Sequence, residues 1–224
     1  MEPPEDVIAP APQRRRPPGS FRWSTLLLFV CWLVPIFGGV AALERYSVQP
    51  ASAGNPPALW PATEPPGPNA GRPALIMFAH PRCPCTSASM EELARIMARA
   101  SGMVDARVIF FCPPNPTADW TDSDLVRSAK AIPGLSVEFD PGGAKARQFG
   151  APTSGLTLLY DRSGKLRFSG GITAARGHAG DNDGEDAVLD LIINHDPSPR
   201  RRHPVFGCAL TECRDARVAQ GASR

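Results

Sequence analysis

Two cysteines separated by one proline are the residues of this chain whose type and spacing best suit chemistry. Residues 80–86 read HPRCPCT and lie between an apolar run and the start of a helical pattern. A cysteine at a helix N-terminus meets unpaired backbone N–H groups and the positive end of the helix dipole, which lower the pKa of its thiol. We therefore predict that Cys83 and Cys85 serve redox chemistry or metal binding rather than forming a merely structural pair.

Metal handling is the alternative to redox chemistry. Two thiolates suit Cu(I) or Zn(II), and a histidine completes such a ligand set. His178 lies in a glycine-rich loop, residues 170–182, which follows the last expected strand and returns to the edge of the sheet that carries the cysteines. Cys83, Cys85 and His178 are thus the predicted ligands of a copper or zinc site, although His178 also suits a solvated position on the loop.

The other cysteines have different expected roles. Cys31 falls in a long apolar segment and is interpreted as a small apolar filler. Cys112 ends a strand pattern and is predicted to be a buried free thiol. Cys208 and Cys213 lie near the C-terminus, where they bridge each other in an oxidising compartment, or Cys208 reaches the active edge as a resolving or third metal thiol. The sequence leaves these alternatives open.

Strand and helix patterns alternate around these residues. Their order is β-α-β-α-β-α-β-β-α, in which the early alternation predicts parallel strands and a tight hairpin over residues 161–164 adds antiparallel ones. The predicted fold class is therefore α/β, a mixed sheet flanked by helices. Strands are expected at residues 74–79, 104–112, 135–139, 156–160 and 166–169, and helices at residues 87–100, 122–131, 144–149 and 186–194, the last capped by Asp183.

Residues 78–86 resemble the active-site turn of the thioredoxin superfamily, with one residue removed from the family's Cys-x-x-Cys pair. Residues 150–153 (GAPT) precede the fourth strand, where proteins of this superfamily carry a cis-proline facing the redox cysteines. The resemblance covers residues 73–195 and leans toward membrane-tethered bacterial members, whose Asp-x-x-Gly hairpin matches residues 161–164. It implies a thioredoxin-like fold and thiol–disulfide exchange.

The resemblance also implies roles for individual residues. Cys83 is the exposed attacking thiol, and Cys85, one step deeper, is its resolving partner. Pro152 follows a cis peptide bond and shapes the groove in which a substrate peptide pairs with the neighbouring backbone, and His80 tunes the thiolate. A disulfide between cysteines two positions apart closes a small, strained ring that is easily reduced, so the direction of the redox reaction stays open.

The front of the chain predicts a membrane segment. Residues 24–43 carry no charge and, as a helix, span about 30 Å, the thickness of a bilayer core. The positive-inside rule then places the N-terminus in the cytoplasm, because four arginines precede the segment: Arg14, Arg15, Arg16 and Arg22. A cleavable signal peptide with a small-residue site around residues 40–42 is the competing interpretation. Either one sends the following domain out of the cytoplasm.

These observations predict a modular chain. Its expected parts are a cytoplasmic segment (1–23), a transmembrane helix (24–43), a Pro/Ala-rich linker (44–72), a thioredoxin-like domain (73–196) and a C-terminal tail (197–224). Charge is nearly balanced, with 24 Lys and Arg against 22 Asp and Glu, so nothing favours binding of nucleic acid. No dinucleotide-binding motif or peroxiredoxin signature is present.

The predicted function is that of a thiol–disulfide oxidoreductase anchored in the inner membrane by a single span, with its domain in the periplasm or outside the cell. Its partners are thiol or disulfide proteins, together with a redox partner protein that supplies electrons, and no cofactor is expected. A copper- or zinc-binding metallochaperone is the alternative. The sequence does not name the physiological substrate.

Overall fold

The computed structural model describes residues 23–64, 71–195 and 199–210 of a chain that divides into two compact units, Met1–Leu43 and Glu44–Arg224. Helix α1 (Trp23–Ser47) has 25 residues and no buried side chain. It is long and apolar enough to cross a membrane, as a signal segment or as an anchor. α1 contains the whole of the predicted span 24–43, whereas the arginines expected to orient it lie outside the described residues.

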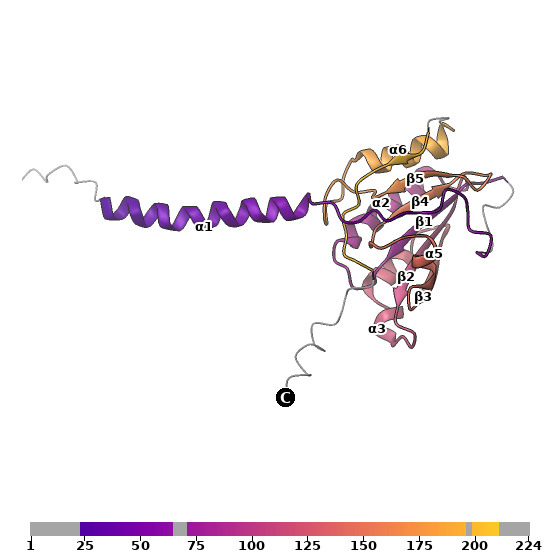
Figure 1. Ribbon diagram of the computed structural model, residues 1–224, viewed down its shortest axis with the longest axis horizontal. Coiled ribbons are helices and arrows are strands. Elements are labelled where there is room, and N and C mark those ends of the chain that lie inside the picture. The colour runs from indigo at the N-terminus through magenta and orange to yellow at the C-terminus, as the bar shows by residue number, and fades with distance from the viewer. Residues whose placement is uncertain (1–22, 65–70, 196–198, 211–224) are drawn as a thin grey trace, which may run out of the picture. The chain divides into compact units, whose positions relative to one another are not determined.

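A mixed sheet forms the centre of the second unit (Figure 1). Its strand order is β3-β2-β1-β4-β5-β6, in which β1, β2 and β3 are parallel, β4 and β5 are each antiparallel to their predecessor in the sheet, and β6 is parallel to β5. This confirms the predicted fold class. The strands are β1 (Ala74–Ala79), β2 (Asp105–Cys112), β3 (Leu135–Pro141), β4 (Thr157–Tyr160), β5 (Leu166–Gly170) and β6 (Arg201–Arg202).

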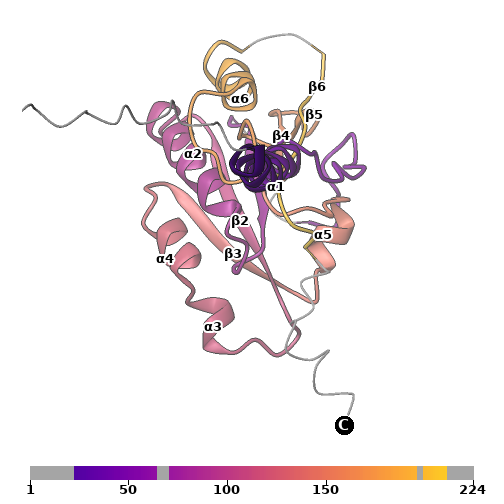
Figure 2. The same ribbon diagram turned by 90° about the vertical axis from the view of Figure 1, so that its left-hand side faces the viewer.

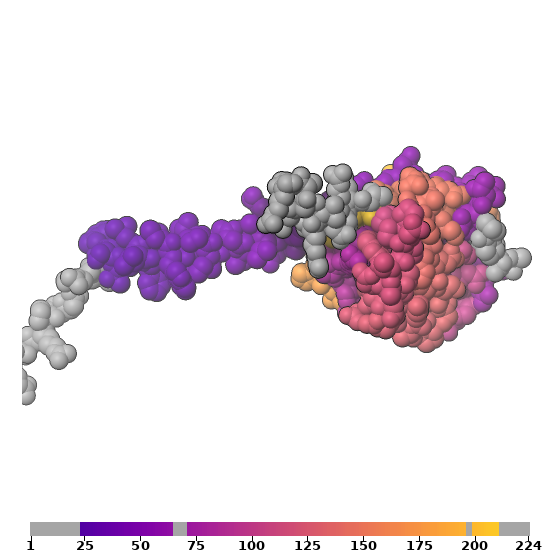
Figure 3. Space-filling view, turned by 90° about the horizontal axis from the view of Figure 1, so that it is seen from below, coloured from indigo at the N-terminus to yellow at the C-terminus, as the bar shows by residue number. Residues whose placement is uncertain are grey.

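Helices cover both faces of the sheet because the buried strands carry apolar side chains on both. Leu75 and Met77 of β1 join the core under α2, α4 and α6, whereas Ile76 and Phe78 join the core on the side of α5. Figure 2 shows α2 and α4 on one side of the sheet and α5 on the other. Figure 3 views the domain from the side of α3 and α5, where the middle of the chain (pink to orange) forms most of the surface. The helices are α2 (Thr86–Arg99), α3 (Ala118–Thr121), α4 (Asp124–Lys130), α5 (Ala144–Gln148) and α6 (Asp183–Ile193).

The hairpin between β4 and β5 is the predicted one. The Gly164 N–H donates to the Asp161 carbonyl at 2.8 Å, and the Asp161 N–H donates to the Lys165 carbonyl at 2.9 Å. The predicted cap of α6 was wrong by one residue. Asn182, in an extended conformation, is the N-cap, and its side-chain oxygen accepts from the Glu185 N–H at 2.9 Å. Both asparagine and aspartate satisfy the first N–H groups of a helix, so the composition alone did not separate them.

The stretch predicted as a linker packs in part against the domain. Ala51 and Leu59 form isolated antiparallel bridges, and the Trp60 ring meets Phe149 and Tyr160 edge to face, with centroids 5.4 and 5.3 Å away. The Trp60 N–H also donates to the carbonyl of Gly164 at 2.7 Å. Its many prolines therefore do not make all of residues 44–72 a tether, because an apolar face of the sheet beside α5 is available to be covered.

Part of the predicted C-terminal tail also belongs to the domain. Residues 201–202 form β6, and Val205 and Leu210 are each 1% exposed in the core on the α5 side. The run at residues 205–210 (VFGCAL) is mostly apolar, which favours burial once a sheet edge lies near it. We call residues 205–210 the C-terminal segment.

We expect Trp60→Ala to lower the free energy of unfolding by about 3 kcal/mol, because it removes an aromatic side chain that packs on two core rings. Leu59→Ala is the control: Leu59 is 65% exposed, and its loss should change stability by about 0.5 kcal/mol or less. Urea unfolding of the full chain in detergent, followed by circular dichroism, measures both. Equal effects of the two substitutions would mean that this stretch does not stabilise the domain.

Candidate functional site

The two predicted cysteines lie in the turn that joins β1 to α2. Inside the turn, the Cys83 N–H donates to the His80 carbonyl at 3.0 Å, and the Cys83 carbonyl accepts from the Thr86 N–H at 3.1 Å. Cys85 is the N-cap residue of α2, and its side chain makes no capping hydrogen bond. Since β1 lies inside the sheet and is buried along its whole length, the turn is fixed to the end of a rigid central strand.

The C-terminal segment lies opposite this turn. The Ser154 N–H donates to the Cys208 carbonyl at 2.8 Å, and the Leu210 N–H donates to the Pro152 carbonyl at 2.8 Å. Between these two bonds, Thr153 and Ala209 form an antiparallel bridge. Cys208 is therefore held beside the turn by backbone pairing with the loop that precedes β4.

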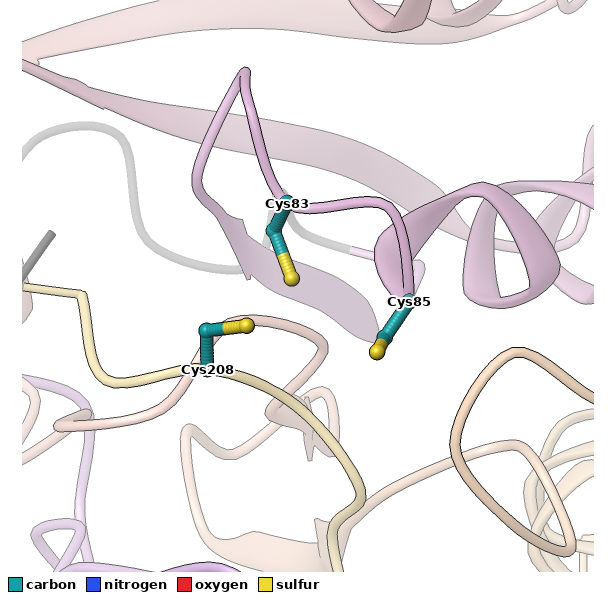
Figure 4. Close-up of side chains that lie close together, drawn as sticks. All are labelled: Cys83, Cys85 and Cys208. Atoms are coloured by element: carbon teal, nitrogen blue, oxygen red, sulfur yellow. The ribbon is translucent and has the colours of Figure 1, made fainter. Parts of the chain in front are cut away.

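The structure brings three sulfur atoms together. The Sγ atoms of Cys83, Cys85 and Cys208 all lie within 4.8 Å of one another. In Figure 4 two of these side chains come from the turn and the start of α2, the third comes from the C-terminal segment, and the sulfurs face a common space. Cys83 is 3% exposed, whereas Cys85 and Cys208 are half-buried.

The surroundings favour a thiolate on Cys83. Burial raises the pKa of its thiol, but hydrogen bonds from the Thr86 hydroxyl and from the side chain and backbone of Cys208 outweigh burial, so the pKa is lowered. For Cys85, burial and then the charge of Cys83 raise the pKa, while the nearby Arg176 guanidinium acts in the opposite direction. The pKa values of the two thiols of the turn are thus shifted in opposite directions, which suits one thiol as the nucleophile and the other as its protonated partner.

A hydrogen bond between two buried hydroxyl groups connects the turn to the loop before β4. The Thr86 Oγ1 and Ser154 Oγ atoms are 2.6 Å apart, and Ser154 Oγ also accepts from the backbone N–H of His80 at 2.8 Å. The ring of His80 is 1% exposed and stacks on Phe111, while its Nδ1 accepts from the Arg82 N–H at 3.2 Å. His80 therefore meets Cys83 through its backbone carbonyl.

Two expectations drawn from the resemblance need correction. The described residues contain no cis peptide bond, so the bond before Pro152 is trans, which is the intrinsically favoured form even before proline. The exposure of the two cysteines is also the reverse of that expected: Cys83 is the buried one. Its burial follows from the C-terminal segment, since Cys208 hydrogen-bonds to its sulfur through both side chain and backbone.

The other candidate residues lie as follows. His178 is exposed, with its Nδ1 3.0 Å from the carbonyl oxygen of Arg176, and the three-sulfur cluster contains Cys208 where the predicted metal site has His178. Cys112 is a fully buried free thiol, as predicted. Cys213 lies outside the described residues. Sequence reasoning left Cys208 undecided, although the apolar residues on either side of it were a signal of burial.

Comparisons with known proteins agree on the fold. No protein-family model and no curated protein sequence matches the chain. An uncharacterized conserved protein of Geobacillus kaustophilus is similar in structure with a TM-score of 0.55 and 18% identity, over 73% of this chain and 92% of that one. For a hypothetical protein of Sinorhizobium meliloti the TM-score is 0.50 and the identity 21%, over 74% and 95% of the two chains. A secreted disulfide oxidoreductase of Mycobacterium tuberculosis matches with a TM-score of 0.40 and 16% identity, over 55% and 82%. The fold of this chain is thioredoxin-like.

Proposed function

We propose that this chain is a membrane-anchored thiol–disulfide oxidoreductase whose domain acts outside the cytoplasm. The observation that carries the proposal is the position of Cys83 and Cys85 on the turn before α2, with their sulfur atoms within 4.8 Å of one another. The lowered pKa of Cys83 and the raised pKa of Cys85 agree with it. Perturbed thiols that are held on a rigid turn and can reach one another are the parts that disulfide exchange needs.

The proposed reaction uses the two cysteines in sequence. The Cys83 thiolate attacks one sulfur of a protein disulfide, which forms a mixed disulfide and releases the first substrate thiolate. The Cys85 thiol loses its proton and attacks the Cys83 sulfur, which releases the second substrate thiolate and leaves a Cys83–Cys85 disulfide. A dithiol partner protein then reduces this bond and regenerates the two thiols. In this proposal Pro152 shapes the substrate groove next to Cys83. Because the C-terminal segment pairs with the Pro152 carbonyl, a substrate peptide must displace that segment to enter the groove.

The test is the reduction of insulin disulfides by dithiothreitol, followed as turbidity, with and without the full chain in detergent. We expect the chain to accelerate the reaction at substoichiometric amounts. A chain that gives no acceleration, and that is purified with one equivalent of copper or zinc on reduced cysteines, would contradict the proposal.

Metal handling remains the second candidate because three sulfur atoms within 4.8 Å of one another suit Cu(I) or Zn(II). In this version the ligands are Cys83, Cys85 and Cys208, whereas His178, the ligand predicted from the sequence, lies outside the cluster of three sulfurs. A competitive Cu(I) titration separates the ligand sets. If the protein is a metal carrier, Cys208→Ser should weaken Cu(I) binding about tenfold or more, whereas His178→Ala should leave it unchanged.

The membrane topology is proposed from the sequence and from α1. Four arginines precede the apolar helix, so the N-terminus should lie in the cytoplasm and the domain outside it. A reporter enzyme that is active only outside the cytoplasm, fused after Arg224, should therefore be active. A reporter that works only inside the cytoplasm serves as the control, and activity of that one alone would reverse the orientation.

A further inference from the structure

The C-terminal segment presents its cysteine to the turn in a fixed position. Gly207 passes so close to the loop before β4 that a Cβ atom there would lie 1.8 Å from the Ser154 carbonyl oxygen. The Gly207 carbonyl accepts a hydrogen bond from the Arg176 guanidinium, which adds a contact on the other side. Together with the backbone bonds of Cys208 and Leu210, these contacts place a third thiol beside the reacting pair.

The contacts of Cys83 are divided between its two cysteine neighbours. The side chain and the backbone of Cys208 both hydrogen-bond to the Cys83 sulfur, and the Cys85 side chain hydrogen-bonds to it as well. The sulfurs lie within 4.8 Å of one another, and a disulfide needs an S–S distance of about 2 Å. Cys85 and Cys208 are therefore both close enough to the Cys83 sulfur to be candidates for a disulfide with it.

We propose that Cys208 is a third redox thiol and that the resting oxidised protein carries a Cys83–Cys208 disulfide, with Cys85 as a thiol. This inference rests on the proposed function, which supplies the first disulfide from a substrate. In the added step, the Cys208 thiolate attacks the Cys83 sulfur. The Cys83–Cys85 bond breaks, the Cys83–Cys208 bond forms, and Cys85 takes up the proton that Cys208 gave up. No net electron transfer occurs, so the step needs no further oxidant.

The exchange is favourable for two physical reasons. A disulfide between Cys83 and Cys85 closes a small ring across a single proline and is strained. A disulfide between Cys83 and Cys208 joins two backbones that are already held beside each other by hydrogen bonds in the folded protein. The oxidised state thereby fixes the C-terminal segment over Cys83 and leaves Cys85, which is half-buried, as the thiol that solvent can reach.

Disulfide mapping of the full chain in detergent tests the proposal. The protein is oxidised with excess oxidised glutathione, quenched in acid, labelled with N-ethylmaleimide and digested with trypsin, which releases residues 83–95 and 203–214 as separate peptides. We expect these two peptides to be joined, with fragmentation placing the bond between Cys83 and Cys208 and the label on Cys85. An internal Cys83–Cys85 bond with labelled Cys208, a Cys208–Cys213 bond, or three reduced thiols around stoichiometric metal would each overturn it.

A pair of matched variants gives a second, independent measurement. In glutathione buffers of known ratio, Cys208→Ser should lower the equilibrium constant for oxidation of the Cys83 thiol at least tenfold, because only the strained bond remains. Cys213→Ser should leave this constant unchanged, and equal constants for Cys208→Ser and the wild type would overturn the proposal. Circular dichroism shows that each variant is folded. The proposed function is judged separately, because wild-type protein that fails to reduce insulin contradicts that function whichever disulfide it forms.

Discussion

We expect Cys83→Ser to lower the rate of insulin reduction by at least about 100-fold, since the hydroxyl that replaces the thiol is not ionised near neutral pH and does not exchange with a disulfide. Cys83 is expected to carry the effect because its pKa is lowered by Thr86 and Cys208, whereas that of Cys85 is raised. The measurement is the initial rate of turbidity at a fixed dithiothreitol concentration.

Two controls sharpen this result. Cys31→Ser changes an exposed cysteine of α1 and should leave the rate as it is. The double variant Cys85→Ser/Cys208→Ser keeps the attacking thiol and lacks both thiols beside it, so it should accumulate a mixed disulfide between Cys83 and the substrate that mass spectrometry detects. A variant lacking Cys83 that retains more than a tenth of the wild-type rate would show that another thiol attacks.

Thr86→Val should shift the pH profile of exchange toward higher pH. The Thr86 hydroxyl stabilises the Cys83 thiolate, and a hydrogen bond to a charged group contributes about 1.5–3 kcal/mol. Its loss should therefore raise the pKa of the Cys83 thiol. Below the pKa of the Cys83 thiol, the thiolate fraction of the Thr86→Val variant, and with it the rate, should be about tenfold lower than in the wild type. Above that pKa, the rate profiles of the variant and the wild type should converge.

The control for this prediction is Thr86→Ser, which keeps the hydroxyl and its contact with Ser154 Oγ at 2.6 Å. Initial rates from pH 5 to pH 9 should give Thr86→Ser a profile close to that of the wild type. If the valine variant follows the wild-type profile as well, the Thr86 hydroxyl does not set the acidity of Cys83.

The sequence predicted best what depends on short stretches of chain. The bounds of β1, Ala74–Ala79, are the same in the expectation and in the structure. A short apolar run that begins after Pro73 and ends before His80 is typical of a buried strand. The placement of Cys83 and Cys85 before α2 follows from the same local pattern. Their relative exposure does not, because it depends on a partner far away in the chain.

The features that the sequence could not provide are non-local. The apolar run around Cys208 indicates burial but contains nothing that names the loop at residues 152–154 as its partner. β6 has only two residues and offers no periodicity to read. His178 was placed near the cysteines from loop topology alone, which does not determine where an exposed side chain points. The cis bond before Pro152 was expected from the family resemblance alone, which does not determine the isomer of a peptide bond.

The close approach of Gly207 to the Ser154 carbonyl has a consequence for how this protein tolerates change. A residue with no functional group sets the spacing between two parts of the chain whose sulfurs must meet. Adding one methyl group there pushes the C-terminal segment away from the turn while every cysteine stays in the sequence. The acidity of Cys83 would then lose the support of Cys208 although no reactive group had been altered, so the position most sensitive to substitution need not be one that takes part in the chemistry.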